Sequence, residues 1–105
     1  MVSVNAGTGG VAFVKDEGLA AYKSSDWAER GFCRTCGSSL YWRLTMDGDL
    51  KGLTMMCAGT LDDLSGLDLT HEVYVDHQPE GYAFAQATHR MTEAEILAMV
   101  NEGAS

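Results

Sequence analysis

The chain has 105 residues, which is enough for one domain of common size, and 46% of them are hydrophobic, which excludes a disordered chain. Its formal net charge is −8, from 15 acidic and 7 basic residues, and this charge argues against nucleic acids and anionic membranes as partners. Neither an apolar run of the roughly 20 residues that a membrane span needs nor a secretory signal is visible. We therefore expect a cytoplasmic globular protein.

The first predicted strands are short and are separated by turn residues. Residues 11–15, V-A-F-V-K, predict a strand, and residues 16–18 predict a turn before a second short strand at residues 19–23. Residues 24–26, S-S-D, have side chains that bond to the nearby backbone and favour another turn.

The clearest hairpin is predicted over residues 40–58. Residues 40–46 alternate, so Tyr41, Arg43 and Thr45 would share one face. The opposite, apolar face would consist of Leu40, Trp42, Leu44 and Met46. The pair Asp47-Gly48 is typical of a type I′ turn, and residues 50–58 would form the return strand. We expect Phe32 to pack beside the cysteine-containing turn that follows it. The strand faces predict four buried side chains: Trp42, Leu44, Leu53 and Met55.

The last third of the chain predicts one more strand and one helix. Residues 71–75, H-E-V-Y-V, form the strand. Residues 92–95, T-E-A-E, are a capping box, and apolar residues then follow at helical spacing up to Gly103, which can end the helix. The expected fold class is mostly β, with antiparallel sheets and one short C-terminal helix in a single domain over residues 1–105.

Cys33 and Cys36 form a C-x-x-C pair, which is the sharpest chemical motif in the sequence. Two cysteines at this spacing on a tight turn can direct both sulfurs at one tetrahedral ion, and Gly37 allows backbone N–H groups to approach the thiolates. The nearby Arg30 and Arg34 would favour thiolate over thiol. The pattern is typical of a zinc knuckle, and it assigns Cys33 and Cys36 as metal ligands in one half of a four-ligand site.

Two other interpretations of the pair stay open. One is a thioredoxin-like redox pair, which would begin a helix after a strand, whereas the residues after Cys36 alternate like a strand. The other is a pair of reduced cysteines in a turn without metal. Cys57 is the third cysteine, and its apolar neighbours on the predicted strand indicate a buried core residue rather than a ligand.

The three histidines match no common metal-binding spacing. His71 and His77 flank a predicted strand, and we expect His71 to be a hydrogen-bonded structural residue and His77 and His89 to be solvated. The loop aspartates do not have the spacing of a calcium loop, and no phosphate-binding loop, dinucleotide fingerprint or nucleophile elbow occurs. The sequence therefore assigns no catalytic residue and no organic cofactor site.

Three segments together resemble the glutathione-dependent formaldehyde-activating enzyme family, to which centromere protein V belongs. They are R-G-F-C-R-T-C-G-S-S-L at residues 30–40, A-G-T-L-D-D at residues 58–63 and H-E-V-Y-V at residues 71–75. The stretch L-A-A-Y-K-S-S at residues 19–25 is similar to the family's approach to its C-x-x-C. The likeness covers roughly residues 9–77.

This resemblance implies a β-tent fold, in which antiparallel sheets are pinned at one end by zinc. It implies a structural zinc held by an upstream C-x-C and by the C-x-x-C that Cys33 and Cys36 match, and a catalytic zinc on a separate upstream C-x-C-x-x-C. The reference activity joins formaldehyde to glutathione and is classed as a carbon–sulfur lyase. No cysteine precedes Cys33 in this sequence. We therefore expect an N-terminally truncated chain (a fragment, a misassigned gene start or a shortened paralogue) that is inactive in that reaction.

Three hypotheses about function follow. The first is a domain of the carbon–sulfur lyase family, which would act on a small thiol adduct such as S-hydroxymethylglutathione through a zinc Lewis acid. The second is a non-catalytic β module whose unpaired sheet edges pair with another copy, so that a homodimer gathers two C-x-x-C pairs around one zinc. The third is a redox protein that uses Cys33 and Cys36.

Overall fold

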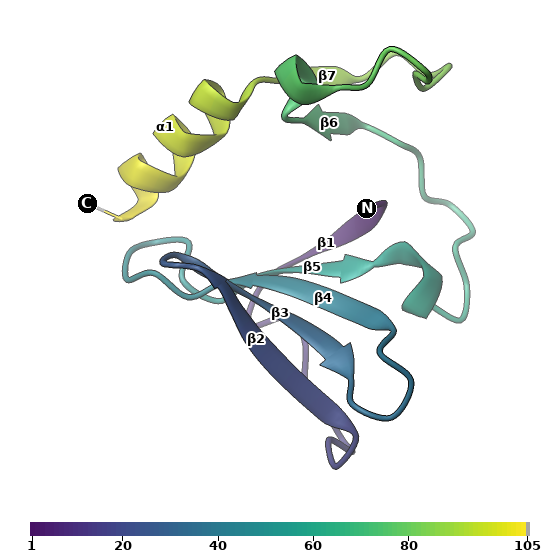
Figure 1. Cartoon of the computed structure of the whole chain (residues 1–105), viewed down its shortest axis with the longest axis vertical. Coiled ribbons are helices and arrows are strands. Elements are labelled where there is room, and N and C mark those ends of the chain that lie inside the picture. The colour runs from purple at the N-terminus through teal and green to yellow at the C-terminus, as the bar shows by residue number, and fades with distance from the viewer. Residues whose placement is uncertain (105) are drawn as a thin grey trace. The chain divides into compact units, whose positions relative to one another are not determined.

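The computed structural model describes residues 1–104, with side chains up to residue 101. The chain divides into two compact units, Met1–Leu64 and Ser65–Gly103. The first unit contains strands β1 to β5, and the second contains strands β6 and β7 and helix α1 (Figure 1). No helix in the described part of the chain is long and apolar enough to cross a membrane.

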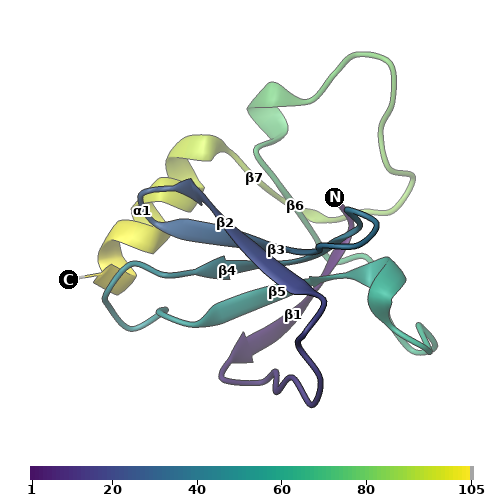
Figure 2. The ribbon, with the colours of Figure 1, turned by 60° about the horizontal axis from the view of Figure 1, so that its bottom comes forward.

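The first unit is built on one five-stranded antiparallel sheet with the strand order β1-β5-β4-β3-β2. Strands β2 to β5 are joined in sequence as neighbours, and β1 pairs with β5 at the far edge, as Figure 2 shows. A short 3-10 helix, η1 (Ala58–Thr60), follows the last strand. The strands are β1 (Ser3–Thr8), β2 (Leu19–Ser25), β3 (Ala28–Cys33), β4 (Ser39–Leu44) and β5 (Leu53–Cys57). The mostly β fold with an antiparallel sheet and one C-terminal helix is therefore confirmed.

Both faces of this sheet bury side chains. Tyr41 and Leu44 lie on opposite faces of β4, and each is only 3% exposed. On the Tyr41 face, the Phe13 ring lies 5.6 Å from the Tyr41 ring, and the Arg43 guanidinium lies 4.7 Å from the same ring. Each face of the sheet therefore carries a buried side chain at β4.

The predicted core is correct at Leu44 and incomplete elsewhere. Trp42, Leu53 and Met55 are half-buried, and so is Phe32 beside the cysteine turn. Tyr41, which was predicted to face away from the core, is buried instead. Alternation shows that two faces of a strand differ, but it does not reveal that another segment covers the second face.

Some predicted strands differ from those observed. Residues 11–15 form no strand and lie in the connection between β1 and β2. The sequence pattern missed β1 and β3, which contain glycine and polar residues and form because neighbouring strands supply their hydrogen-bond partners.

The connection between β4 and β5 is longer than the predicted two-residue turn. Residues 45–52 form this loop, which is closed by the Gly52 N–H donating to the Leu44 carbonyl at 2.8 Å. Gly52 has a φ of +88°, a left-handed conformation that favours glycine. Lys51 pairs with Asp47 at 2.9 Å across the loop. The prediction of a type I′ turn at Asp47-Gly48 is therefore wrong, whereas the predicted hairpin is present.

The second unit contains a parallel two-stranded sheet formed by β6 (His71–Val73) and β7 (His89–Met91). The prediction of antiparallel sheets is therefore wrong for this unit. Strand β7 was not predicted from the sequence. The predicted strand over residues 71–75 ends early because Tyr74 has a φ of 57°, which turns the chain into the 3-10 helix η2 (Val75–His77).

Helix α1 (Glu93–Ala104) begins at the predicted capping box. The Glu95 N–H donates to the Thr92 hydroxyl at 3.3 Å, and the Thr92 N–H donates to the Glu95 carboxylate at 3.2 Å. Ile96 and Val100, which lie one turn apart, are buried. Leu97 and Met99, which belong to the same apolar series, are exposed, so the helical spacing predicted the buried side of α1 only in part.

The close packing of Gly31 against Tyr41 is testable by substitution. A Cβ at Gly31 would overlap the Tyr41 ring, and the buried ring has little room to move. We expect Gly31→Ala to lower the free energy of unfolding by about 1–3 kcal/mol in chemical denaturation. The control is Gly18→Ala, because a Cβ at Gly18 meets no atom within 4 Å. Equal unfolding midpoints for the two variants would contradict the packing.

Candidate metal-binding site

Cys33 and Cys36 lie on the tight turn that joins β3 to β4. Cys33 is the last residue of β3, and β4 begins soon after Cys36. The Cys33 N–H donates to the Ser38 carbonyl at 2.9 Å, and the Gly37 N–H donates to the Cys33 carbonyl at 2.7 Å. Gly37 has a φ of +81°, which a residue with a Cβ rarely adopts. The turn therefore holds both cysteines within one hydrogen-bonded loop that continues into a strand and not into a helix.

The thiols of the pair share a hydrogen-bonded environment. The Cys36 sulfur is exposed and lies 3.2 Å from the Ser38 hydroxyl oxygen. Hydrogen bonds from the Ser38 hydroxyl, then from the Ser38 backbone and then from the Cys33 side chain, lower the pKa of Cys36 to about 7. A large fraction of Cys36 is therefore thiolate at neutral pH, which is the form that binds metals and reacts with electrophiles.

Arg34 fixes the position of the turn rather than activating the thiols. Its backbone N–H donates to the Gly18 carbonyl at 2.8 Å, and its guanidinium donates to the Leu19 carbonyl at 2.9 Å. The causes that lower the pKa of Cys36 are hydrogen bonds, and the charges of Arg30 and Arg34 are not among them. The lowered pKa of Cys36 thus comes from Ser38 and Cys33, whereas the sequence analysis attributed it to the arginines.

Cys57 lies at the end of β5. It pairs with Ser3 of β1, and its thiol donates to the Met1 sulfur at 3.1 Å. The side chain is half-buried and not fully buried, so the predicted core position is only partly right. Its described sulfur contact is thus with Met1 and not with the C-x-x-C pair.

The described residues bring no third ligand-type side chain to Cys33 and Cys36. Among the side chains that the structure describes, those of residues 1–101, the one group of three His, Cys, Asp or Glu side chains that could hold a metal ion consists of Asp76, His77 and Glu93. The cysteine pair thus offers two of the four ligands that a tetrahedral zinc site needs.

The histidines differ from each other in their contacts. His71 is hydrogen-bonded as predicted, with its Nδ1 atom 2.9 Å from the Thr70 hydroxyl, and its ring lies 5.2 Å from the ring of His89. His77 was predicted to be solvated, and its side chain is 61% exposed, yet its Nε2 lies 2.9 Å from a Glu93 oxygen. This hydrogen bond, followed by the charge of Asp76, raises the pKa of His77. No local pattern indicated that contact, because the partners are 16 residues apart.

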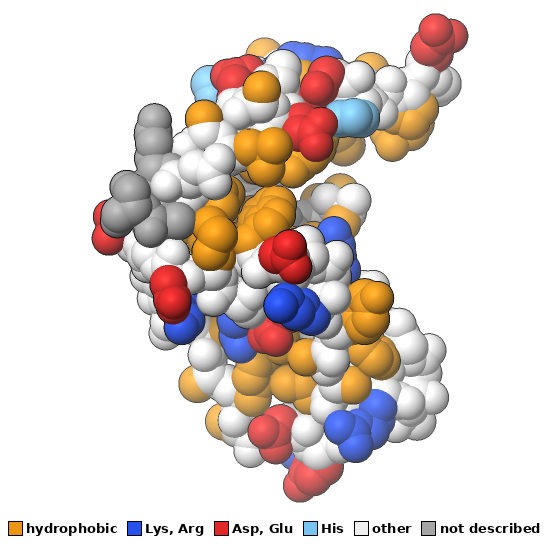
Figure 3. Space-filling model, turned by 60° about the vertical axis from the view of Figure 1, so that its left-hand side comes forward, with side chains coloured by type: hydrophobic (Ala, Val, Ile, Leu, Met, Phe, Trp, Pro, Cys, Tyr) orange, Lys and Arg blue, Asp and Glu red, His pale blue; other side chains and the backbone are white. Residues whose placement is uncertain are grey.

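Charged side chains lie in small separate groups on the face of the molecule in Figure 3. Acidic side chains outnumber basic ones in the chain, with a net charge of −8.

A comparison with known proteins finds a similar lyase. The chain is 30% identical over 83 residues to an uncharacterized lyase of Schizosaccharomyces pombe. The match covers 79% of this chain and 58% of the relative, so the chain spans little more than half the length of that protein. No family model matches the chain. No solved structure matches it either.

The role of Ser38 in the ionisation of Cys36 is testable on metal-free, reduced protein. We expect Ser38→Ala to raise the pKa of Cys36 from about 7 toward 9.0, because the variant removes the hydroxyl that makes the largest contribution while keeping the backbone hydrogen bond. Iodoacetamide alkylation of Cys36 at pH 7, followed by peptide mass spectrometry, should slow several-fold. Ser39→Ala is the matched control and should leave the alkylation rate unchanged. An unchanged rate in Ser38→Ala would show that another group sets this pKa.

Proposed function

We propose that this chain is a zinc-binding β-tent domain of a carbon–sulfur lyase of the glutathione-dependent formaldehyde-activating class. The observation that supports this most directly is the placement of Cys33 and Cys36 on one hydrogen-bonded turn between two antiparallel strands. The sequence around this turn resembles that family, and the similarity to a lyase of fission yeast supports the reaction class.

The chemistry of the turn suits two zinc ligands. Zinc binds thiolates, and a pKa of about 7 leaves about half of Cys36 ionised at neutral pH, with Ser38 and then Cys33 as its hydrogen-bond partners. The exposure of Cys36 leaves its sulfur accessible to an ion that other ligands also hold. A zinc ion bound here would link the β3–β4 turn to the segment that supplies its remaining ligands, and would thereby stabilise one end of the sheet.

The proposed substrate of the whole enzyme is a small thiol adduct such as S-hydroxymethylglutathione, formed from glutathione and formaldehyde. The three cysteines of this chain cannot provide both a structural and a catalytic zinc site. We therefore propose that the 105-residue chain is inactive alone, and that the active form includes further cysteine ligands. The reduced thiols that zinc requires suit the proposed location in the cytoplasm.

A second candidate is a non-catalytic module that forms a homodimer. Two observations favour it: Cys36 is exposed, and β1 and β2 are the edge strands of the five-stranded sheet. Edge strands offer unpaired backbone groups to another copy, and a two-fold axis could place two C-x-x-C pairs around one zinc.

The pKa of Cys36 also suits the redox alternative, whereas the strand that follows the pair does not favour it.

Zinc content and mass in solution distinguish these candidates. We expect the reduced chain to bind zinc through Cys33 and Cys36, and this zinc is counted as the excess over the zinc content of Cys36→Ser. The excess should be one zinc per two chains where the site is shared between copies. Elemental analysis and light scattering measure the two quantities, and Co²⁺ substitution should give a sulfur-to-cobalt charge-transfer band. Cys33→Ser and Cys36→Ser should abolish that band, and Cys57→Ser is the matched control that should retain it. A reversible Cys33–Cys36 disulfide in protein that gives no cobalt–thiolate band would favour redox chemistry instead.

The lyase assignment is tested by comparing two forms of the protein. The 105-residue chain should not accelerate adduct formation between glutathione and formaldehyde in an NMR assay. A form extended by the upstream reading frame should do so, provided that this frame encodes C-x-C and C-x-C-x-x-C. Turnover by the short chain that is lost in Cys36→Ser would contradict the need for further ligands. An extended form that contains these motifs, binds zinc and remains inactive would contradict the lyase assignment.

A further inference from the structure

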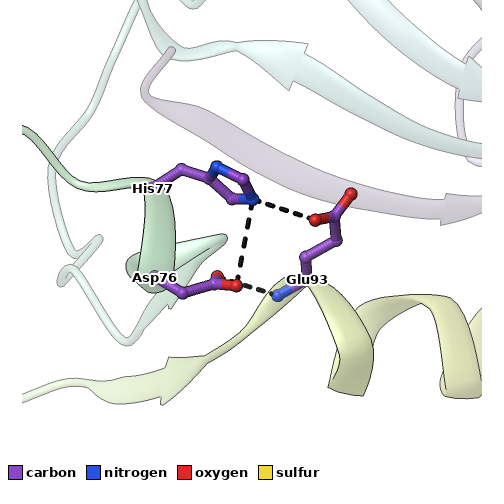
Figure 4. A group of neighbouring side chains, drawn as sticks. All are labelled: Asp76, His77 and Glu93. Atoms are coloured by element: carbon purple, nitrogen blue, oxygen red, sulfur yellow. Dashed lines mark hydrogen bonds and ion pairs between the residues drawn. The ribbon is translucent and has the colours of Figure 1, made fainter.

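The second unit brings together three side chains that sequence spacing did not connect. Asp76 and His77 belong to η2, and Glu93 is the first residue of α1 (Figure 4). The His77 Nε2 atom lies 2.9 Å from Glu93 Oε2 and 3.8 Å from Asp76 Oδ2. All three ligand atoms lie within 4.8 Å of one another. We propose that Asp76, His77 and Glu93 form a binding site for a divalent transition-metal ion such as Zn²⁺.

The spacing of these atoms fits a common coordination geometry. Zinc lies about 2.0–2.2 Å from imidazole nitrogens and carboxylate oxygens, so tetrahedral ligand atoms are about 3.3 Å apart. The observed separations of 2.9 Å and 3.8 Å lie on either side of that value. The remaining separation, between the Asp76 and Glu93 oxygens, is at most 4.8 Å, so the carboxylates would have to rotate toward each other to receive an ion. The ion would take the place of the proton between His77 and Glu93.

The backbone around the site holds the ligands in place. The left-handed Tyr74 redirects the chain after β6, and its carbonyl accepts the His77 N–H at 2.9 Å. Asp76 uses its Oδ1 atom to accept the Glu93 N–H at 3.0 Å, which leaves Oδ2 facing His77 (Figure 4). A hydrogen-bonded second oxygen is a common way to orient a ligating carboxylate. The two segments are therefore joined at this point without a metal.

The charges around the site also favour a divalent cation. Two carboxylates balance the charge of the ion and offset the positive end of the α1 dipole. Arg90, the nearest basic residue in sequence to Glu93, is occupied by Glu72 at 3.2 Å and by Gln78 at 2.8 Å. The side chains of His77, Asp76 and Glu93 are 61%, 44% and 45% exposed. Three protein ligands with solvent access leave an open coordination position, as in catalytic and not structural zinc sites.

This site is independent of the cysteine pair, so the experiment removes that pair first. The 105-residue chain with Cys33→Ser and Cys36→Ser is titrated with Zn²⁺ by calorimetry, and the histidine ring nitrogens are followed by ¹H–¹⁵N NMR. We expect one Zn²⁺ per chain, with a shift of the His77 ring signals. His77→Ala and Glu93→Gln should each weaken binding by at least about tenfold.

His89→Ala is the matched control, because His89 is an exposed histidine of the same unit that contacts His71 and not the proposed ligands. Binding should survive in this variant, and circular dichroism of the metal-free proteins checks that each variant keeps its fold. The proposal would be overturned if His77→Ala left the zinc affinity unchanged, or if no zinc bound up to millimolar Zn²⁺. Asp76, His77 and Glu93 would then form only a hydrogen-bonded ion pair. Neither result bears on the proposed function of the cysteine pair, because both cysteines are replaced in the protein tested.

Discussion

The register between β3 and β4 is the constraint on which the cysteine site depends. Gly31 pairs with Tyr41, while the next residue, Phe32, pairs with Ser39, so β4 has one extra residue at Leu40. Such a bulge bends a strand and changes the direction of nearby side chains. The cysteine turn follows directly on β3, and its first hydrogen bond joins Cys33 to Ser38. The register shift therefore lies between the closely packed Gly31–Tyr41 pair and the turn that holds Ser38 beside the Cys36 thiol.

The sequence predicts the parts of the fold whose pattern is local. Strands β2, β4 and β5 overlap the predicted strands, and α1 begins at its capping box, because apolar spacing and end signals lie within each segment. Strands β1 and β3 depend on backbone pairing with their neighbours, which no single segment encodes. The burial of Tyr41 depends on the Phe13 ring and the Arg43 guanidinium packed against it. Non-local pairing and coverage of a second face therefore explain most of the differences.

The same distinction between local and non-local contacts applies to the side chains that could bind a metal ion. The turn with Cys33 and Cys36 was predictable because both residues and their hydrogen-bond partner Ser38 lie within six consecutive residues. The contribution of Arg34 was misjudged because its guanidinium reaches a carbonyl 15 residues away. The contact between His77 and Glu93 spans 16 residues and depends on how η2 meets α1. Its components are ordinary polar residues in the sequence and become a group only in the folded unit.

The two proposed sites differ in ligand chemistry, so they should differ in the range of ions that they accept, although both can bind zinc. Thiolates such as those of Cys33 and Cys36 select zinc and other soft or borderline ions, whereas one imidazole with two carboxylates also accepts harder ions such as Mn²⁺. The net charge of −8 attracts cations of either kind to the chain without choosing between them. Selectivity must therefore come from the donor atoms. A hard divalent ion should bind at Asp76, His77 and Glu93 while leaving the thiols free, and this difference separates the sites even when both are intact.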